Sequence, residues 1–134
     1  MITSCIVAPR VSAKTIKASL EAEGKNVCWI TISGLRSKGL VTGSSKHILS
    51  MFFDDVSHPN FGVSHNQARK IKNFILNHHF NSKHEWVILV NCIAGISRSA
   101  AVGIFVQTNL GVPTTFIESC HPNKLLLQRL GVKQ

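Results

Sequence analysis

The chain has 134 residues, of which 44% are hydrophobic and 16% are charged. This length suits one domain with a real hydrophobic core, and the composition excludes a disordered tail or a fibrous repeat. Its 15 Lys and Arg against 6 Asp and Glu give a formal net charge of +9, which predicts attraction to anionic ligands. No signal-peptide pattern opens the sequence, and no apolar run approaches the ~20 residues of a membrane span, so we expect a soluble, cytoplasmic protein.

The basic residues are scattered along the chain. No run of Lys and Arg is longer than two residues, and Tyr is absent. Proteins that bind single-stranded nucleic acid combine a basic groove with exposed aromatic rings on which bases stack. The pattern therefore favours a basic surface that attracts anionic ligands over a dedicated nucleic-acid-binding protein.

The four cysteines are widely separated and form no C-x-x-C pair. In an intracellular protein this spacing argues against a disulfide framework or a zinc site. Cys5 and Cys28 lie in apolar, strand-like segments, and we expect both to be buried. His78, His79 and His84 lack the spacing of a metal-binding motif, and we expect them to be solvated near the end of a helix.

The N-terminal part of the chain predicts a strand, a helix and a second strand. Residues 4–8 predict a short strand, because they are mainly apolar. Residues 12–23 predict a helix that Ser12 caps and Gly24 ends. Residues 27–32 are rich in β-branched side chains, which predicts a buried strand.

The middle of the chain predicts two loops, a strand and a helix. Glycines in residues 33–46 predict a loop, and residues 48–53 predict a third strand. A second loop with Pro and Gly follows at residues 56–63. Residues 64–67 have the spacing of a capping box, which predicts a helix to about residue 79.

The C-terminal part predicts the core of the domain. Residues 86–90 are almost all apolar, as in a central parallel strand buried on both faces. Residues 100–106 predict a core helix, and residues 122–130 predict a terminal amphipathic helix. The alternation of strands and helices predicts one α/β domain over residues 1–134, with a mostly parallel central sheet flanked by helices.

The residues suited to chemistry lie together in residues 91–99, Asn-Cys-Ile-Ala-Gly-Ile-Ser-Arg-Ser. In open α/β sheets ligands bind beyond the carboxyl ends of the strands, where backbone N–H groups and a helix N-terminus attract anions. Gly95 permits a tight turn there, and the guanidinium of Arg98 matches two phosphate oxygens. Such a positive environment lowers the pKa of a thiol, so Cys92 is a candidate nucleophile.

The pattern C-x5-R-S after an apolar strand, here VILVNCIAGISRSAAVGIF, resembles the signature of the cysteine-based protein tyrosine phosphatases. It is most similar to their dual-specificity branch and its small bacterial and phage-type members. Residues 53–56 resemble the F-x-D-[IV] pattern of those members, and residues 121–130 resemble their tail segment. The resemblance covers about residues 29–130. It implies a dual-specificity-phosphatase-like domain whose signature loop joins a central strand to a buried helix.

The resemblance implies a role for each residue of this loop. Cys92 would attack phosphorus to form a cysteinyl-phosphate, and Ser99 would assist departure of the thiolate in the second step. It implies no metal and no organic cofactor. The residues that would bind the phosphate oxygens are Ile93, Ala94, Gly95, Ile96, Ser97 and Arg98.

A general acid must protonate the leaving oxygen and then activate water. Asp55 is our candidate, because it occupies the F-x-D-[IV] position at the start of the loop at residues 56–63. Asp54 is the alternative, and strand alternation predicts that only one of the two reaches the signature loop.

One position departs from the family pattern, because Asn91 stands where most members have His. Asn carries no positive charge, so we expect Cys92 to be less acidic than in relatives and catalysis to be slow. The first expected substrate is a protein phosphorylated on tyrosine, or on serine or threonine, and we expect a monomer. The alternatives are an RNA 5′-triphosphatase and, in a different class, a phosphate-reading binding module with weak or no turnover.

Overall fold

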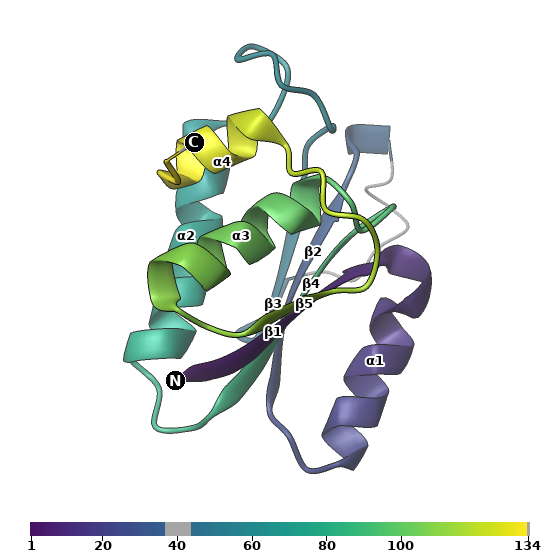
Figure 1. The fold of residues 1–134 in the computed structure, drawn as a ribbon, viewed down its shortest axis with the longest axis vertical. Helices are drawn as coiled ribbons and strands as arrows, with labels where there is room; N and C mark the ends of the chain where they lie inside the picture. The colour runs from purple at the N-terminus through teal and green to yellow at the C-terminus, as the bar shows by residue number, and fades with distance from the viewer. Residues whose placement is uncertain (37–43, 134) are drawn as a thin grey trace.

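The computed structural model describes residues 1–36 and 44–133, and within them one five-stranded sheet has the order β3-β2-β4-β1-β5. All neighbouring strands run parallel, which confirms the predicted α/β class (Figure 1). Residues 37–43 of the predicted loop 33–46 lie outside the described residues. The elements are β1 (Ile2–Pro9), α1 (Arg10–Ala22), β2 (Val27–Ser33), β3 (Ile48–Phe52), α2 (His65–Phe80), β4 (Trp86–Cys92), α3 (Arg98–Leu110), β5 (Thr114–Phe116) and α4 (Lys124–Leu130).

The strand β4 lies at the centre of the sheet, between β2 and β1. All of its residues are buried, as the continuous apolar sequence predicts for a parallel strand covered on both faces. Its carboxyl end therefore lies in the middle of one edge of the sheet, which is where the signature loop begins.

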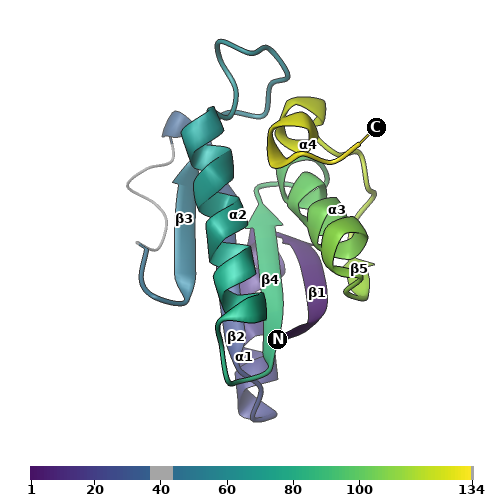
Figure 2. The ribbon, with the colours of Figure 1, turned by 90° about the vertical axis from the view of Figure 1, so that its left-hand side faces the viewer.

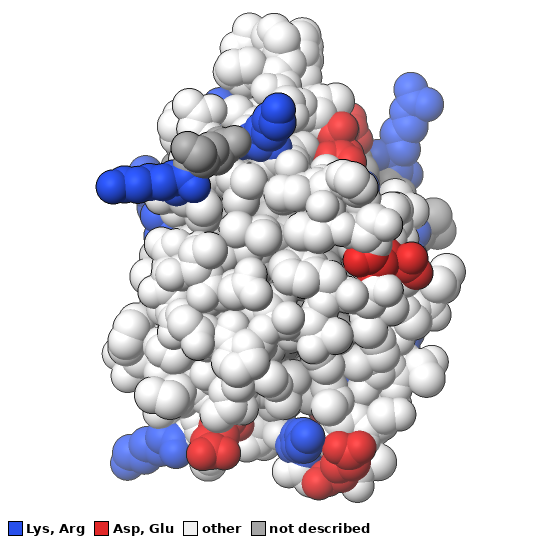
Figure 3. Space-filling model, viewed as in Figure 1, with Lys and Arg blue, Asp and Glu red and all other residues white. Residues whose placement is uncertain are grey.

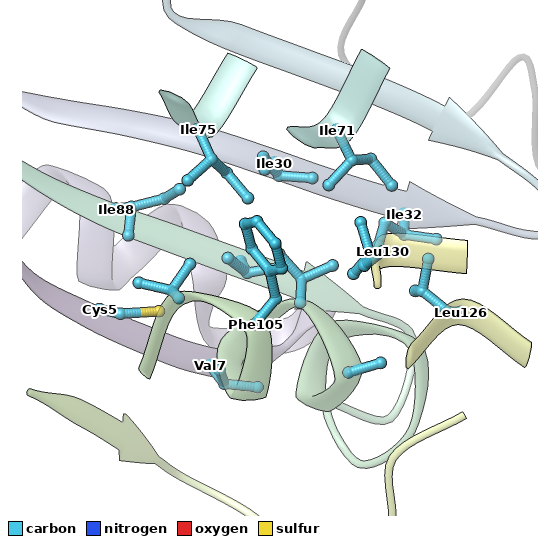
Figure 4. Packing of buried hydrophobic residues seen from close by; sticks show 14 of the residues in the cluster. Cys5, Val7, Ile30, Ile32, Ile71, Ile75, Ile88, Phe105, Leu126 and Leu130 are labelled. Carbon is cyan, nitrogen blue, oxygen red and sulfur yellow. The ribbon is translucent and has the colours of Figure 1, made fainter. Parts of the chain in front are cut away.

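The helices cover both faces of the sheet. The apolar side of α1 packs on one face, and α2, α3 and α4 pack on the other (Figures 1 and 2). Ile71 and Ile75 of α2 meet Phe105 of α3 and Leu126 of α4 in the larger core, which Figure 4 shows at close range. No helix among the described residues is long and apolar enough to cross a bilayer.

The start of α1 differs from the prediction. Ser12 does not cap the helix, which begins at Arg10 directly after Pro9. Because proline fixes φ near −65°, the extended Pro9 (φ −74°, ψ 159°) provides the N-cap conformation at the end of β1. The hydroxyl of Ser12 instead donates to the Pro9 carbonyl at 3.3 Å.

The predicted capping box at the start of α2 is confirmed. The Ser64 hydroxyl accepts a hydrogen bond from the backbone N–H of Gln67 at 3.1 Å, and the Gln67 side chain accepts one from Ser64 at 2.9 Å. The amide nitrogen of Gln67 also donates to the Phe52 carbonyl at 2.9 Å. The same residues that start the helix therefore fix it to the end of β3.

The expectation of solvated histidines is wrong for His78, which is only 8% exposed. Because α2 continues to Phe80, His78 falls on the same inward face as Ile71 and Ile75. His84, in the loop before β4, is exposed as expected.

Two details near the C-terminus were not predicted correctly. The three-residue strand β5 pairs with β1 at the edge of the sheet, and it is too short to give a sequence pattern. The terminal helix begins at Lys124 rather than at Pro122, with Asn123 as its N-cap. On the face seen in Figure 3, charged side chains lie mainly near the margins, in agreement with their scattered placement in the sequence.

Candidate active site

The loop at residues 93–97 joins the carboxyl end of β4 to the N-terminus of α3. Cys92 is the last residue of β4 and Arg98 is the first residue of α3. Gly95 has φ +71°, and a Cβ atom there would lie 2.4 Å from the Pro9 nitrogen. The loop can thus rest against the end of β1 only because this position has no side chain.

Hydrogen bonds from other segments of the chain hold the carbonyl groups of the loop in place. Three of them accept hydrogen bonds from backbone N–H groups of other segments, at distances of 2.9 to 3.2 Å. The Ser97 side chain, at the N-cap of α3, accepts no hydrogen bond from the first turn of that helix, so no capping side chain blocks this N-terminus from a ligand. The bonded pairs, donor first, are Arg10 to Ile93, His121 to Ile96 and Asn123 to Ser97.

Cys92 is buried, with 2% of its surface exposed, and its Sγ lies 3.0 Å from the Ser99 hydroxyl oxygen. Burial by itself raises the pKa of this thiol. The Ser99 hydroxyl and the backbone N–H groups of Ser99, Gly95 and Ser97 outweigh burial and lower the pKa below its ordinary value. The other three cysteines have raised pKa values, so Cys92 is the thiol best suited to act as a thiolate.

Arg98, the first residue of α3, is also buried, with 6% of its surface exposed. One terminal nitrogen, Nη1, donates to the Phe53 carbonyl at 2.9 Å, which fixes the guanidinium between α3 and the end of β3. Its Nε is buried and has no hydrogen-bonding partner among the described residues. A buried donor without an acceptor is costly, so this edge of the guanidinium suits a bound anion.

The two candidate acids lie in different surroundings. Asp55 Oδ1 accepts hydrogen bonds from the Ser97 hydroxyl and from the Asn123 side-chain amide, both at 2.8 Å. Asp54 Oδ1 instead accepts from the backbone N–H of Leu35 at 3.2 Å. The structure brings Asp55 against the signature loop and directs Asp54 toward the segment after β2.

Asn123 is a site residue that the sequence analysis missed. It is 5% exposed, and its side chain holds Asp55, donates to the Val56 carbonyl at 3.1 Å and accepts from Leu126 at 3.0 Å. Its place before an apolar helix could have indicated an N-cap, but nothing in the sequence indicates contact with a residue 68 positions away.

Trp29 is a second residue that the sequence did not indicate. Its indole nitrogen donates to Asn91 Oδ1 at 2.7 Å, and both side chains are buried. The Asn91 amide nitrogen lies 3.5 Å from the Cys92 carbonyl oxygen. Because side chains alternate along a strand, this pair lies on the α1 side of the sheet, behind the loop that surrounds Cys92.

No protein-family model matches this sequence, and no curated protein matches it significantly. Among solved structures, a human tyrosine phosphatase-like serine/threonine/tyrosine-interacting protein is similar, with TM-score 0.59, 20% identity, and coverage of 93% of this chain and 87% of that one. The PTP-2 phosphatase of Cydia pomonella has TM-score 0.61 and 15% identity over 95% and 83% of the two chains. DUSP15 has TM-score 0.50 and 19% identity over 93% and 80%.

These similarities show the fold. The chain has the α/β fold of the cysteine-based tyrosine and dual-specificity phosphatases, as the resemblance of residues 92–99 implies. The identities are low, so the chemistry of this chain has to be argued from its own residues.

Proposed function

We propose that the protein hydrolyses phosphate monoesters on phosphorylated proteins, at tyrosine and also at serine or threonine. The observation that carries this proposal is the environment of Cys92. Its thiol has a lowered pKa and lies at the loop that leads to the N-terminus of α3. That helix begins with Arg98, whose buried Nε lacks a hydrogen-bonding partner among the described residues. A thiolate beside a site for a tetrahedral anion is the arrangement that nucleophilic attack on phosphorus requires.

In the first step the Cys92 thiolate attacks phosphorus in line with the leaving oxygen. The S–P bond forms as the P–O bond to the leaving group breaks. Asp55 in its protonated form gives its proton to that oxygen, from its place against Ser97. Arg98 and the loop N–H groups stabilise the charge on the remaining phosphate oxygens.

In the second step water attacks the cysteinyl-phosphate. Asp55, now a carboxylate, takes a proton from the water, and the S–P bond breaks to release inorganic phosphate. The Ser99 hydroxyl, 3.0 Å from Sγ, donates a hydrogen bond to the departing thiolate.

The mechanism is tested by hydrolysis of an aryl phosphate in the presence of a chelator. We expect activity in the wild type and none in Cys92→Ser. Cys120→Ser is the matched control, because Cys120 is exposed and outside the site, and it should retain full activity. Activity that persists in Cys92→Ser would contradict the mechanism.

A phosphate-reading binding protein is the second candidate. One solved structure with this fold is described as a phosphatase-like interacting protein, and Asn91 departs from the family pattern. Saturable binding of a phosphopeptide by the wild type without release of phosphate would favour it. Another neighbour, PTPMT1, was solved with PI(5)P, but the loop here lacks the Lys typical of phosphoinositide phosphatases.

RNA is the remaining alternative substrate, because a net charge of +9 suits a polyanion. Competition of RNA with the aryl phosphate, together with release of phosphate from an RNA 5′-triphosphate end, would favour it over protein substrates. We propose that the protein acts as a cytoplasmic monomer.

A further inference from the structure

A cavity of about 870 Å³ lies at the end of the sheet opposite to Cys92. It is formed where β2, β3 and β4 begin, the end from which the β4 arrow points away in Figure 2. The carboxyl-terminal halves of α1 and α2 also line it. It contains none of the residues of the candidate active site, so it needs an explanation of its own.

The wall of the cavity is positively charged. Four lysines line it, Lys17, Lys25, Lys46 and Lys83, with Glu21 as the acidic residue. Lys17 pairs with Glu21 at 3.0 Å and Lys25 pairs with Glu23 at 3.5 Å, so those charges are partly compensated. Lys46 and Lys83 form no ion pair within residues 1–36 and 44–133. Their ammonium groups are free to attract an anion.

Two histidines in the cavity wall form a hydrogen-bonded chain whose protons can be assigned. His78 Nδ1 lies 2.8 Å from the Phe74 carbonyl oxygen, which can only accept, so this nitrogen carries a proton. In the neutral ring His78 Nε2 is then an acceptor, and it receives a hydrogen bond from His47 Nδ1 at 2.9 Å. The remaining nitrogen of His47, Nε2, is left with a lone pair.

This order makes His47 the residue that can gain a proton. Protonation of His47 at Nε2 keeps both hydrogen bonds and adds a charged donor, whereas protonation of His78 at Nε2 would break the contact between the rings. Burial lowers the pKa of His47, and His78, Lys46 and His84 lower it further. The other charged residues in the cavity wall are Lys17, Lys25, Lys83 and Glu21. A bound anion would place a negative charge near His47 and so raise its pKa.

We propose that this cavity binds an oligophosphate and that His47 takes up a proton when the ligand enters. A phosphate chain carries several negative charges along its length, which suits two separate ammonium groups and an imidazolium. Ser45, Ser82 and Asn26 in the wall provide further hydrogen-bond donors. The volume is within the roughly 300–1,000 Å³ of small-molecule sites.

The two tryptophans of the chain allow binding at the two ends of the sheet to be observed separately. The Trp86 indole donates to Ser82 at 2.7 Å, and both residues line the cavity. The Trp29 indole donates to Asn91 behind the signature loop. The experiment is a titration of the ¹⁵N-labelled protein with inorganic pyrophosphate, followed through the two indole N–H signals. We expect a saturable shift of the Trp86 signal, independent of any shift of the Trp29 signal.

Charge variants test whether the lysines hold the ligand. Lys46→Gln/Lys83→Gln should weaken the affinity measured at Trp86 by about fivefold or more. Lys14→Gln/Lys70→Gln is the matched control, because it removes the same charge from exposed positions outside the cavity, and it should change the affinity less than twofold.

His47→Gln tests the uptake of a proton. As the pH is lowered from 7.5 to 5.5, the ratio of the wild-type affinity to the variant affinity should rise by about three- to tenfold. Protonation of pyrophosphate itself affects both proteins equally, so it does not change this ratio. Any of three results would overturn the proposed site: a Trp86 signal that does not saturate, a response at Trp29 alone, or equal affinities in the two double-lysine variants. A ratio that does not change with pH would overturn the role of His47. The Trp86 readout does not depend on phosphatase activity, so its failure would leave the proposed function untouched.

Discussion

At the scale of single residues, the local donors decide whether a buried thiol is reactive. Cys92 and Cys5 are almost equally buried, with 2% and 1% of their surfaces exposed. Burial raises the pKa of Cys5 to about 12. The pKa of Cys92 is lowered instead, because hydroxyl and backbone N–H groups surround its sulfur.

The two neighbouring aspartates give a matched pair of variants. Asp55→Asn should lower kcat by about 10²–10⁴-fold for a substrate with a poor leaving group, because the general acid is lost. The loss should be smaller for p-nitrophenyl phosphate, whose leaving group needs little protonation. Asp54→Asn makes the same change one residue away and should have little effect. A larger loss in Asp54→Asn would transfer the role to Asp54.

The hydrogen bond between Trp29 and Asn91, next to Cys92 in β4, predicts an effect of Trp29 on Cys92. In Trp29→Phe the Asn91 Oδ1 loses its donor while remaining buried, so the amide before Cys92 is no longer fixed. We expect the pKa of Cys92 to rise, because the backbone that positions the donors around its sulfur is held less firmly. The pH dependence of iodoacetamide alkylation measures it. Trp86→Phe removes an indole donor at the other end of β4, so an equal rise there would show a non-specific effect.

At the scale of elements, α4 and the segment before it hold residues 55–56 in place. Asn123 caps α4 and also holds Asp55 and the Val56 carbonyl. The backbone N–H groups of His121 and Asn123 donate to the carbonyls of Ile96 and Ser97. The segment before a short terminal helix thus links Asp55, the proposed general acid, to the signature loop.

The two roles of Asn123 can be separated by two variants. Asn123→Ala should cost about 1 kcal/mol of stability through the lost cap. It should also lower kcat by about tenfold for a poor leaving group, because Asp55 loses a partner. Asn123→Ser should restore stability, since serine caps helices well, but its shorter side chain should not restore kcat. Urea unfolding and steady-state kinetics measure the two effects, and a joint recovery of both in Asn123→Ser would show that Asn123 acts on stability alone.

At the scale of the whole molecule, the buried thiols predict how stability depends on pH. The pKa values of Cys5 and Cys28 are raised to about 12, whereas an unfolded chain has thiols near ~8.5. The stability that these protonated thiols contribute is therefore fully present below about pH 8.5, and it is lost as the pH rises toward 12. At pH 10 each thiol should lower the free energy of unfolding by about 2 kcal/mol.

Urea unfolding at pH 8 and pH 10 measures this loss. Between pH 8 and pH 10, Cys28→Ala should show about half of the loss in unfolding free energy that the two buried thiols cause. Cys120→Ala changes an exposed position and should reduce this loss only slightly. Equal losses in the wild type and in Cys28→Ala would contradict the prediction.

The sequence by itself determined the class of fold and pointed to the loop where the candidate site lies. Continuous apolar residues predict β4, the spacing of Ser64 and Gln67 predicts the start of α2, and residues 92–99 predict the loop that follows β4. These features are local, because periodicity, capping and a short motif each involve neighbouring residues.

Tertiary structure alone decided the contacts between distant segments. Strand alternation predicted that only one of Asp54 and Asp55 reaches the loop, and Asp55 lies there because Ser97 and Asn123 bind it. His78 is buried because α2 packs on the sheet, and Trp29 meets Asn91 because β2 lies beside β4. Each contact depends on strand order and helix packing, and a single sequence without its fold contains no direct signal for either.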